Sequence, residues 1–133
     1  MLRLLLSAIL LSFLSSTVSA QEKITIAKDG TGKFSSVQQV LDAISPGNKK
    51  PITIYIKNGI YKEKIHLDSS KNYITITGED KFKTILTFDD HAGKVTRNGD
   101  TINTRTSASF LVRGDNFTAE NLTIQNDAGL TAG

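Results

Sequence analysis

The chain has 133 residues, of which 22% are charged and 38% hydrophobic, and it contains neither cysteine nor tryptophan. These proportions suit one ordinary globular domain and exclude a disulfide-rich scaffold or a long disordered region. The formal net charge is only +3, and the basic residues are interspersed with acidic ones instead of forming a stripe with aromatic residues. We therefore expect no nucleic-acid partner, whereas an acidic polymer and a plain solvated surface both fit this charge.

Residues 1–20, MLRLLLSAILLSFLSSTVSA, begin with a single basic residue, continue with an apolar run and end on the small residues Val18-Ser19-Ala20. This order is typical of a cleavable secretory signal peptide. A membrane anchor is the alternative, but serines interrupt the apolar run before it reaches the ~20 residues that a span requires. We predict cleavage after Ala20 and a secreted or periplasmic product, residues 21–133, without a membrane anchor.

Short segments rich in β-branched and aromatic residues recur through the rest of the chain, and clusters of Gly, Asn, Asp and Lys separate them. Such segments are typical of strands bounded by turns. We expect strands at residues 24–27, 51–61, 73–78, 84–90 and 109–114, and a closing pair of strands within residues 117–126.

One helix is predicted, at residues 35–44. Ser35 or Ser36 can cap the free amides at its start, and Pro46-Gly47 follows its end. Its apolar residues recur at a spacing of three and four positions and share one face: Val37, Val40, Leu41 and Ile44. The helix therefore has one side to bury against the strands.

The segment FTAENLTIQN, residues 117–126, shows how the strands connect. Two short strands meet at Asn121, and Asn126 stands where the next bend is expected. Asparagine tolerates the left-handed backbone that a corner of one residue needs, whereas a hairpin requires a reversing turn of two or more residues. A chain that turns corners without reversing winds around an axis. The prediction is an all-β parallel β-helix with roughly 20 to 25 residues per coil, in place of a sandwich, with the helix capping its N-terminal end.

The two histidines and one glycine-containing segment could suggest a metal site and a phosphate-binding loop, but structural roles fit them better. His66 and His91 each stand without a second ligand at metal-binding spacing, so we expect no metal site. KDGTGKF, residues 28–34, lacks both the full spacing of a phosphate-binding loop and the Ser or Thr that follows its lysine. We interpret this segment as a turn.

Two further patterns also favour structural roles. Asp89-Asp90-His91 has the composition of a paired-carboxylate site, but adjacent strand residues point to opposite faces, so we interpret it as a solvated loop. Asn116-Phe-Thr118 and Asn121-Leu-Thr123 match the N-glycosylation pattern. Because these asparagines fall at expected corners between strands, we interpret them as structural.

Five blocks carry a resemblance to a known family: AKDGTGKFSSVQQVLDAI, IYIKNGIYKEKI, ITITGED, TILTFDD and FTAENLTIQNDAG. In this order they resemble the amino-terminal part of a pectinesterase, or pectin methylesterase, over residues 24–133. They include its G-x-Y-x-E signature as Gly59, Tyr61 and Glu63, which we interpret as structural. The resemblance implies a right-handed parallel β-helix, in agreement with the corner at Asn121. It also implies hydrolysis of the methyl esters of polygalacturonate to methanol and free carboxylates.

The resemblance extends to partners and to one site residue. It implies pectin, as homogalacturonan, for the substrate, no cofactor, and a monomer when the protein is complete. Thr104, in TRTSASF, aligns with the threonine of the family's Thr-x-x-Ser-Ala-(Thr/Ser)-Phe run that contacts the polysaccharide. A polar loop residue without that role is the open alternative for Thr104.

The catalytic groups that the resemblance implies are expected beyond Gly133. In the family, blocks of the form Q-A-V-A-L, Q-D-T-L, D-F-I-F-G and R-P-W follow, and they supply oxyanion-binding glutamines, an acid-base aspartate, a nucleophilic aspartate and an arginine that holds it. None of these blocks occurs in this sequence. We therefore expect residues 21–133 to be the N-terminal part of a pectinesterase β-helix domain, without esterase activity alone. A non-catalytic pectin-binding module and a structural β-helix are the alternatives.

Overall fold

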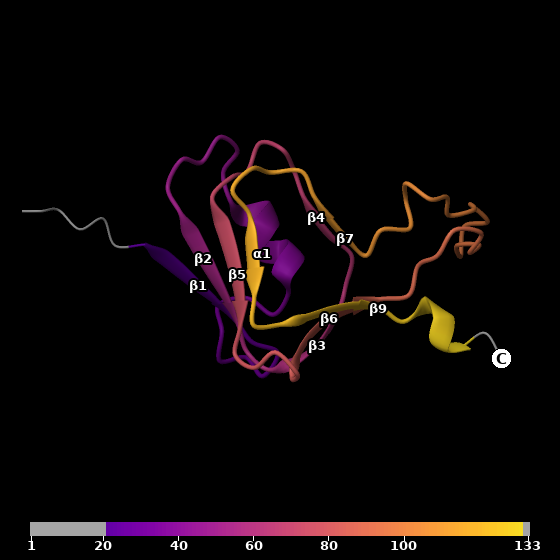
Figure 1. The fold of residues 1–133 in the computed structure, drawn as a ribbon, viewed down its shortest axis with the longest axis horizontal. Coiled ribbons are helices and arrows are strands. Elements are labelled where there is room, and N and C mark those ends of the chain that lie inside the picture. The colour runs from indigo at the N-terminus through magenta and orange to yellow at the C-terminus, as the bar shows by residue number, and fades with distance from the viewer. Residues whose placement is uncertain (1–20, 132–133) are drawn as a thin grey trace, which may run out of the picture.

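The protein is described by a computed structural model that covers residues 21–131 (Figure 1). The predicted signal peptide lies outside the described residues. In chain order the elements are β1 (Glu22–Ile26), α1 (Val37–Ala43), β2 (Ile52–Ile56), β3 (Gly59–Lys62), β4 (Ile65–Leu67), β5 (Ile74–Gly78), β6 (Thr84–Phe88), β7 (Phe110–Val112), β8 (Thr118–Glu120), β9 (Thr123–Asn126) and the short 3-10 helix η1 (Ala128–Thr131). Within residues 21–131, no helix has the length and apolar character needed to cross a bilayer.

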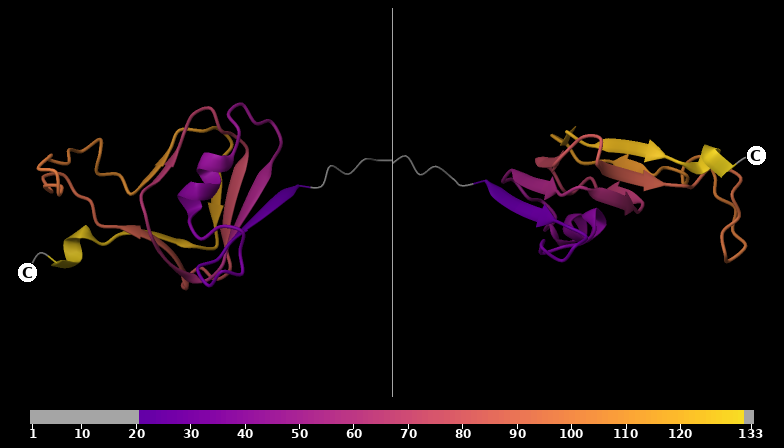
Figure 2. Two further views of the ribbon diagram at one scale, coloured as in Figure 1. Left: turned by 180° about the vertical axis from the view of Figure 1, so that it is seen from behind. Right: turned by 90° about the horizontal axis from the view of Figure 1, so that it is seen from below.

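The strands of residues 21–131 all pair in parallel and form three sheets. The first sheet has the order β1-β2-β5-β8, the second β3-β6-β9, and the third β4-β7. Figure 1 looks roughly along the coil axis, so the sheets appear as the sides of a coil, and the right view of Figure 2 shows the coils stacked one on another. Each strand therefore pairs with the equivalent strand of the next coil, as the prediction of a parallel β-helix requires.

Inward side chains of neighbouring coils lie in register rows. Ile54 pairs with Ile76 in the first sheet, and Tyr61 pairs with Leu86 in the second. All four are at most 2% exposed. Since full burial of a large apolar side chain stabilises a fold by about 1.5–3 kcal/mol, rows of this kind hold the coils together. The core depends on stacking, because no single coil encloses an interior of its own.

The corner predicted at Asn121 is present. Asn121 has φ of 53°, in the left-handed region, and its side-chain amide donates 2.7 Å to the carbonyl of Gly78 in the coil beneath. Asn116 makes a second such corner, with φ of 54°. The expectation of a similar bend at Asn126 is wrong. Asn126 has no left-handed backbone and ends β9, while its side chain bonds to neighbouring segments.

The helix caps the N-terminal end of the coils, as predicted. Figure 2 shows α1 on the side of the stack formed by β1, and its residues Val37, Val40 and Leu41 are buried there. Of the two candidate capping serines, Ser36 is the N-cap, and its hydroxyl accepts a hydrogen bond from the amide of Gln39. The helix is shorter than predicted, because Ile44 already has an extended backbone.

The strand predictions are confirmed in outline, with two differences. The segment predicted as one strand at 51–61 contains two, because the chain turns a corner between β2 and β3. The sequence reading missed β4, which is only three residues long and pairs with β7. A short strand of this kind carries too little alternation to be recognised without its partner.

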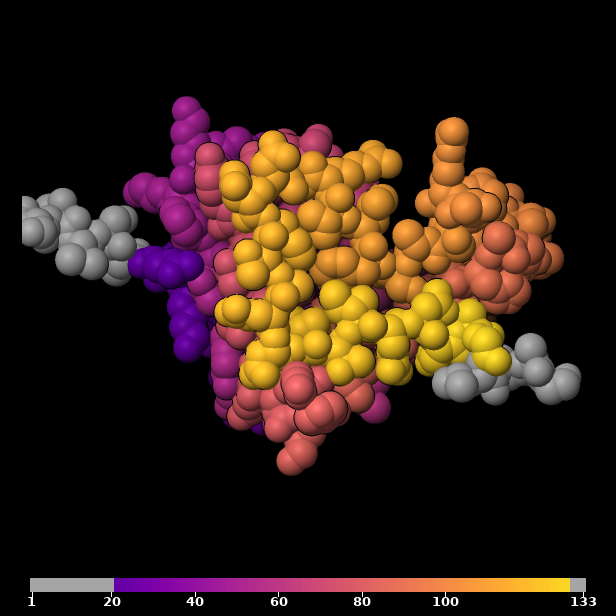
Figure 3. Space-filling view, in the orientation of Figure 1, coloured from indigo at the N-terminus to yellow at the C-terminus, as the bar shows by residue number. Residues whose placement is uncertain are grey.

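Coil length varies more than predicted. Ile52 pairs with Ile74 and Gly59 pairs with Thr84, which are spacings within the expected range. Thr75, however, pairs with Thr118, because a long excursion, residues 89–109, leaves the coil between β6 and β7. Figure 3 shows this excursion in orange, standing apart from the body of the stack.

Candidate functional site

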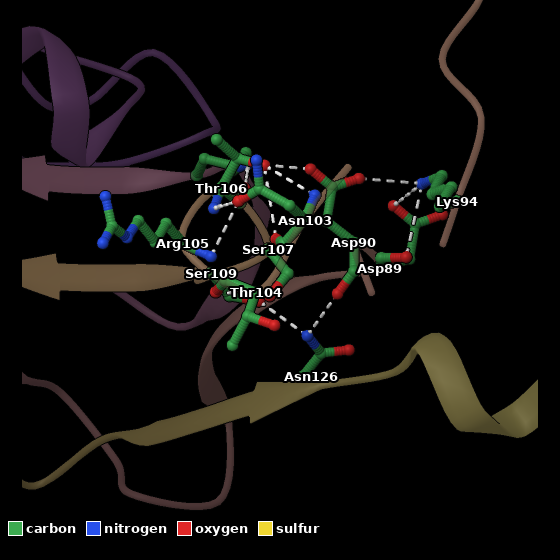
Figure 4. A network of polar contacts seen from close by, with 11 residues as sticks. Asp89, Asp90, Lys94, Asn103, Thr104, Arg105, Thr106, Ser107, Ser109 and Asn126 are labelled. Atoms are coloured by element: carbon green, nitrogen blue, oxygen red, sulfur yellow. Dashed lines mark hydrogen bonds and ion pairs between the residues drawn. The ribbon is translucent and has the colours of Figure 1, made fainter. Parts of the chain in front are cut away.

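Thr104 is exposed on a tight turn near the end of the excursion (Figure 4). The side-chain oxygen of Asn103 builds the turn, because it accepts hydrogen bonds from the amides of Arg105 at 2.9 Å and Thr106 at 3.1 Å. The hydroxyl of Ser107 donates 3.1 Å to the carbonyl of Thr104. The backbone around Thr104 is thus fixed locally, while its own side chain faces solvent.

Residues 93–102 of the excursion form a small antiparallel loop. The amide of Gly93 donates to the carbonyl of Ile102, and the amide of Ile102 donates to that of Lys94, both at 2.8 Å. Ile102 is 8% exposed, so it gives the excursion an apolar anchor of its own. The loop therefore has internal order and is not a solvated connection along its whole length.

Asp90 corrects the prediction of a solvated loop at Asp89-Asp90-His91. The residue is only 7% exposed, and its two carboxylate oxygens have separate partners. Lys64 donates 2.8 Å to Oδ2, and Lys94 donates 3.0 Å to Oδ1. Asp89 is half-buried and pairs with Lys62 at 3.3 Å and Lys94 at 3.2 Å. The alternation argument fails here, because Asp89 and Asp90 follow the end of β6 and both carboxylates contact Lys94. It also could not show that lysines from other segments would converge on them.

The electrostatics of this cluster keep its aspartates charged. Burial raises the pKa of Asp90, but hydrogen bonds from Lys64 and Lys94 and their charges outweigh burial and hold that pKa below the usual value of 3.8. The pKa of Asp89 is lowered chiefly by its hydrogen bond from Lys94. The same pairs raise the pKa of Lys94. A carboxylate with both oxygens bonded to lysines is neither a free base nor a free nucleophile.

Asn126 closes the cluster from the following coil. Its side-chain amide donates 2.8 Å to the carbonyl of Asp90 and 3.0 Å to the hydroxyl of Ser109. Its side-chain oxygen accepts from the amide of Ala128 at 2.9 Å. Because Asp90 and Ser109 lie at opposite ends of the excursion, Asn126 holds both ends at one corner of the stack.

The signature residues Gly59, Tyr61 and Glu63 lie away from the excursion's turn and make internal contacts. Tyr61 is fully buried, and its hydroxyl donates 2.8 Å to the carbonyl of Lys57. Burial is the main cause that raises the pKa of Tyr61, with smaller effects from nearby carboxylates. Gly59 has φ of 156°, and a Cβ there would stand 3.3 Å from the Tyr61 ring. The small residue therefore leaves room for the ring.

Glu63 joins the helix to the coil. Its Oε1 accepts 2.7 Å from the amide of Gln38 and 3.2 Å from the hydroxyl of Ser36, so it helps to cap α1. Gln38 in turn bonds to both the amide and the carbonyl of His66 in β4. No pattern within the helix itself could reveal a cap supplied from another coil.

The histidines, the turn at residues 28–34 and the glycosylation-type triplets remain to be placed. His66 and His91 are exposed, and no group of three or more metal-ligating side chains gathers among residues 21–131. The turn predicted at residues 28–34 is present, because Asp29 accepts 2.9 Å from the amide of Thr31. In the two glycosylation-type triplets, both asparagines occupy left-handed corners, and the side chain of Asn121 is bonded to the backbone beneath it.

A groove lies at the N-terminal end of the stack, between β1 and α1. Its volume is about 590 Å³, and apolar residues such as Ile24, Phe34 and Ile44 line it together with Lys33 and Glu22. None of its lining residues comes from the excursion. The groove and the Thr104 turn are therefore separate features.

Comparisons with known proteins decide the family. The family model described as Pectinesterase matches residues 23–133. The chain belongs to the pectinesterase family. Among curated relatives, a probable pectinesterase/pectinesterase inhibitor of Arabidopsis thaliana is 37% identical over 108 residues, which cover 81% of this chain and 18% of that protein.

Solved pectin methylesterases share the fold. The enzyme from carrot is 31% identical, with a TM-score of 0.68 over 83% of this chain and 33% of its own. A pectin methylesterase in complex with a hexasaccharide is 27% identical, with a TM-score of 0.71 over 82% of this chain and 32% of its own. The parallel β-helix expected for a pectinesterase is thereby confirmed. The chain spans about a third of the length of these structures.

Proposed function

We propose that this chain is part of a secreted pectinesterase, which hydrolyses the methyl esters of homogalacturonan in pectin and so serves pectin catabolism or cell wall modification. The observation that carries the proposal is agreement along the whole described chain. The family match spans residues 23–133, and the coils superpose on pectin methylesterases over more than four fifths of the chain. The reaction releases methanol and leaves free carboxylates, without a cofactor.

The ester-cleaving groups of this proposal lie outside residues 21–133. Ester hydrolysis by a carboxylate requires a free, oriented nucleophile and fixed donors for the developing oxyanion, each donor being worth about 3–4 kcal/mol. Asp90 is the buried carboxylate among the described residues, and two lysines occupy both of its oxygens. The groups that act on the ester are those that the family places in later blocks of sequence.

In this proposal Thr104 contacts the polysaccharide. Its side chain is exposed on a turn whose backbone is held by Asn103 and Ser107. A methyl-esterified galacturonate carries no charge, so hydroxyl and carbonyl groups suit it better than a fixed ion pair does. Gly59, Tyr61 and Glu63 support the coil and the helix cap, and take no part in the reaction.

Two measurements test the proposal on the enzyme. The coding sequence downstream of codon 133 should continue in frame into Q-A-V-A-L and D-F-I-F-G blocks, and a protein extended through them should release methanol from esterified pectin. Residues 21–133 alone should release none above background. Methanol release by residues 21–133 would contradict the assignment of the chemistry to later blocks. A stop codon at that point would favour the non-catalytic pectin-binding or structural module.

Secretion is tested separately. Export through a secreting host should remove residues 1–20, because Val18-Ser19-Ala20 gives the small-residue pattern that signal peptidase recognises. N-terminal sequencing of the exported protein should begin at Gln21. A product that still begins at Met1 would refute the signal peptide.

A further inference from the structure

We infer that Lys64 is a positioning residue for Thr104. We call the first and last residues of the excursion its two stems; Asp90 belongs to the first and Thr106 to the second. The ammonium group of Lys64, in the preceding coil, bonds to both stems and so fixes the position of the Thr104 turn. The contacts of Lys64 lie within this chain, and only their consequence for binding pectin depends on the proposed function.

Lys64 contacts both stems directly. Its Nζ donates 2.8 Å to Oδ2 of Asp90, at the start of the excursion, and also donates to the carbonyl of Thr106, near its end. Thr106 belongs to the turn that Asn103 builds around Thr104. An ammonium has three donors, so one lysine can satisfy a carboxylate and a carbonyl at once. One side chain of the preceding coil therefore contacts both the start of the excursion and the turn that carries Thr104.

Asp90 is held by a lysine on each side. It is buried, and its other oxygen accepts 3.0 Å from Lys94, which belongs to the excursion itself. The carboxylate is thus held between a lysine of the coil and a lysine of the excursion. Movement of the excursion away from the stack would separate the buried carboxylate of Asp90 from one of these lysines, and a buried charge without its partner is unfavourable.

A residue of the following coil, Asn126, contacts both ends of the excursion from the opposite side. The side-chain amide of Asn126 bonds to the carbonyl of Asp90 and to the hydroxyl of Ser109. We name Lys64, Asp90 and Asn126 the stem clamp. Its members come from three successive passes of the chain at one corner, as Figure 4 shows for Asp90 and Asn126. The ends of the excursion are therefore hydrogen-bonded to both the preceding coil and the following coil.

Lys62 provides a matched control. It lies at the end of β3, two residues before Lys64, and pairs with Asp89 at 3.3 Å. Its side chain is 54% exposed, and within residues 21–131 it makes no hydrogen bond to the Thr104 turn. An exposed pair of this kind contributes little. If the effect of Lys64 were only that of a surface charge, Lys62 would have it too.

The test is amide hydrogen exchange on the full chain. Lys64→Met keeps the length of the side chain but removes its donors, and we expect the amides of Gly93, Ile102 and Ser107 to exchange on the order of tenfold faster. Amides of β2 and β5 should keep their protection. Lys62→Met should leave all of these rates unchanged, and Lys64→Arg, which retains a multidentate cation, should restore most of the protection. Unchanged protection in Lys64→Met, or an equal loss in Lys62→Met, would overturn the inference.

A second variant covers the case in which Lys64→Met fails to fold. Asn126→Ala removes the grip of the following coil without leaving a buried charge unpaired. The same amides of the excursion should then exchange faster, while those of β2 and β5 do not. Loss of protection in every strand with Lys64→Met, together with no effect of Asn126→Ala, would refute the stem clamp.

A titration with an oligogalacturonide, followed by the NMR signal of the Thr104 methyl group, separates this inference from the proposed function. The wild-type signal should shift with ligand, and Lys64→Met should need a several-fold higher concentration for the same shift. No shift in the wild type would refute the contact between Thr104 and pectin, while the exchange data would still decide the stem clamp. An equal affinity in Lys64→Met and wild type would refute the positioning role.

Discussion

The carboxylate of Glu63, just beyond β3, accepts a 2.7 Å hydrogen bond from the amide of Gln38 in the first turn of α1. This amide has no partner within the helix, because the first amides of any helix lack a preceding carbonyl. A negative charge at this end also interacts favourably with the helix dipole. The helix that closes the N-terminal end of the stack is therefore fastened to it by a carboxylate from another coil.

Glu63→Ala should lower the free energy of unfolding by about 1–2 kcal/mol, since it leaves a partly buried helix amide without its charged acceptor. Urea denaturation followed by circular dichroism measures the loss. Lys62→Ala is the control, because that exposed side chain makes only a surface pair, and it should change stability by less than about 0.5 kcal/mol. Equal effects of the two substitutions would show that Glu63 does not cap the helix.

Asn121→Val should destabilise the protein by about 1–3 kcal/mol, because a β-branched residue is strained at φ of 53°. Asn121→Gly keeps the backbone free of strain but removes the 2.7 Å bond to Gly78, so it should cost only about 1 kcal/mol. Urea midpoints of the two variants measure the difference. If both variants lose the same stability, the preference for asparagine comes from its side-chain hydrogen bond and not from the left-handed backbone.

Gly78→Ala should be more damaging than its small size suggests. A Cβ at this position would stand 2.2 Å from the carbonyl oxygen of Asn121, which is backbone and cannot rotate away. We expect a loss of about 3 kcal/mol and a lower thermal midpoint, as in overpacked cores. Gly129→Ala, where a Cβ would meet nothing within 4 Å, should change stability by less than about 0.5 kcal/mol. A well-tolerated Gly78→Ala would contradict the close stacking of these two coils.

Acid should loosen the excursion. The folded protein holds the pKa of Asp90 below its ordinary value, because the lysine bonds and charges outweigh the effect of burial. The unfolded chain therefore takes up the proton first, so the stability from Asp90 is present above about pH 3.9 and is lost as pH falls through the folded pKa. The charged groups that face the carboxylate of Asp90 are Lys64 and Lys94, while the amide of Asn126 bonds to its backbone carbonyl.

Urea denaturation at pH 7 and at pH 3 measures this dependence. Asp90→Asn should reduce the difference in stability between the two pH values, because the amide does not titrate. Asp100→Asn is the control, since Asp100 is exposed and has no ion pair among the described residues. A pH dependence that is the same in wild type and Asp90→Asn would show that Asp90 contributes nothing to acid stability.

The sequence by itself determined the winding of the chain. Strand alternation, the apolar face of the helix and a single asparagine between two strands are local features, and each depends on the steric limits of a few neighbouring residues. They were enough to predict parallel coils with a helical cap and to exclude a hairpin at Asn121. The family resemblance added the expectations of a right-handed coil and of ester hydrolysis.

Only the tertiary structure decided which side chains meet. From the sequence, Asp90 is interpreted as a solvated loop residue. The stacking of coils brings Lys64 to it, and the fold of the excursion brings Lys94, and neither contact can be predicted from the sequence near Asp90. Glu63 caps a helix that lies far from it in the sequence. In a parallel β-helix, neighbours in space are separated by a whole coil, and the length of each coil depends on its loops. Contacts across coils are therefore set by register, which no local pattern contains.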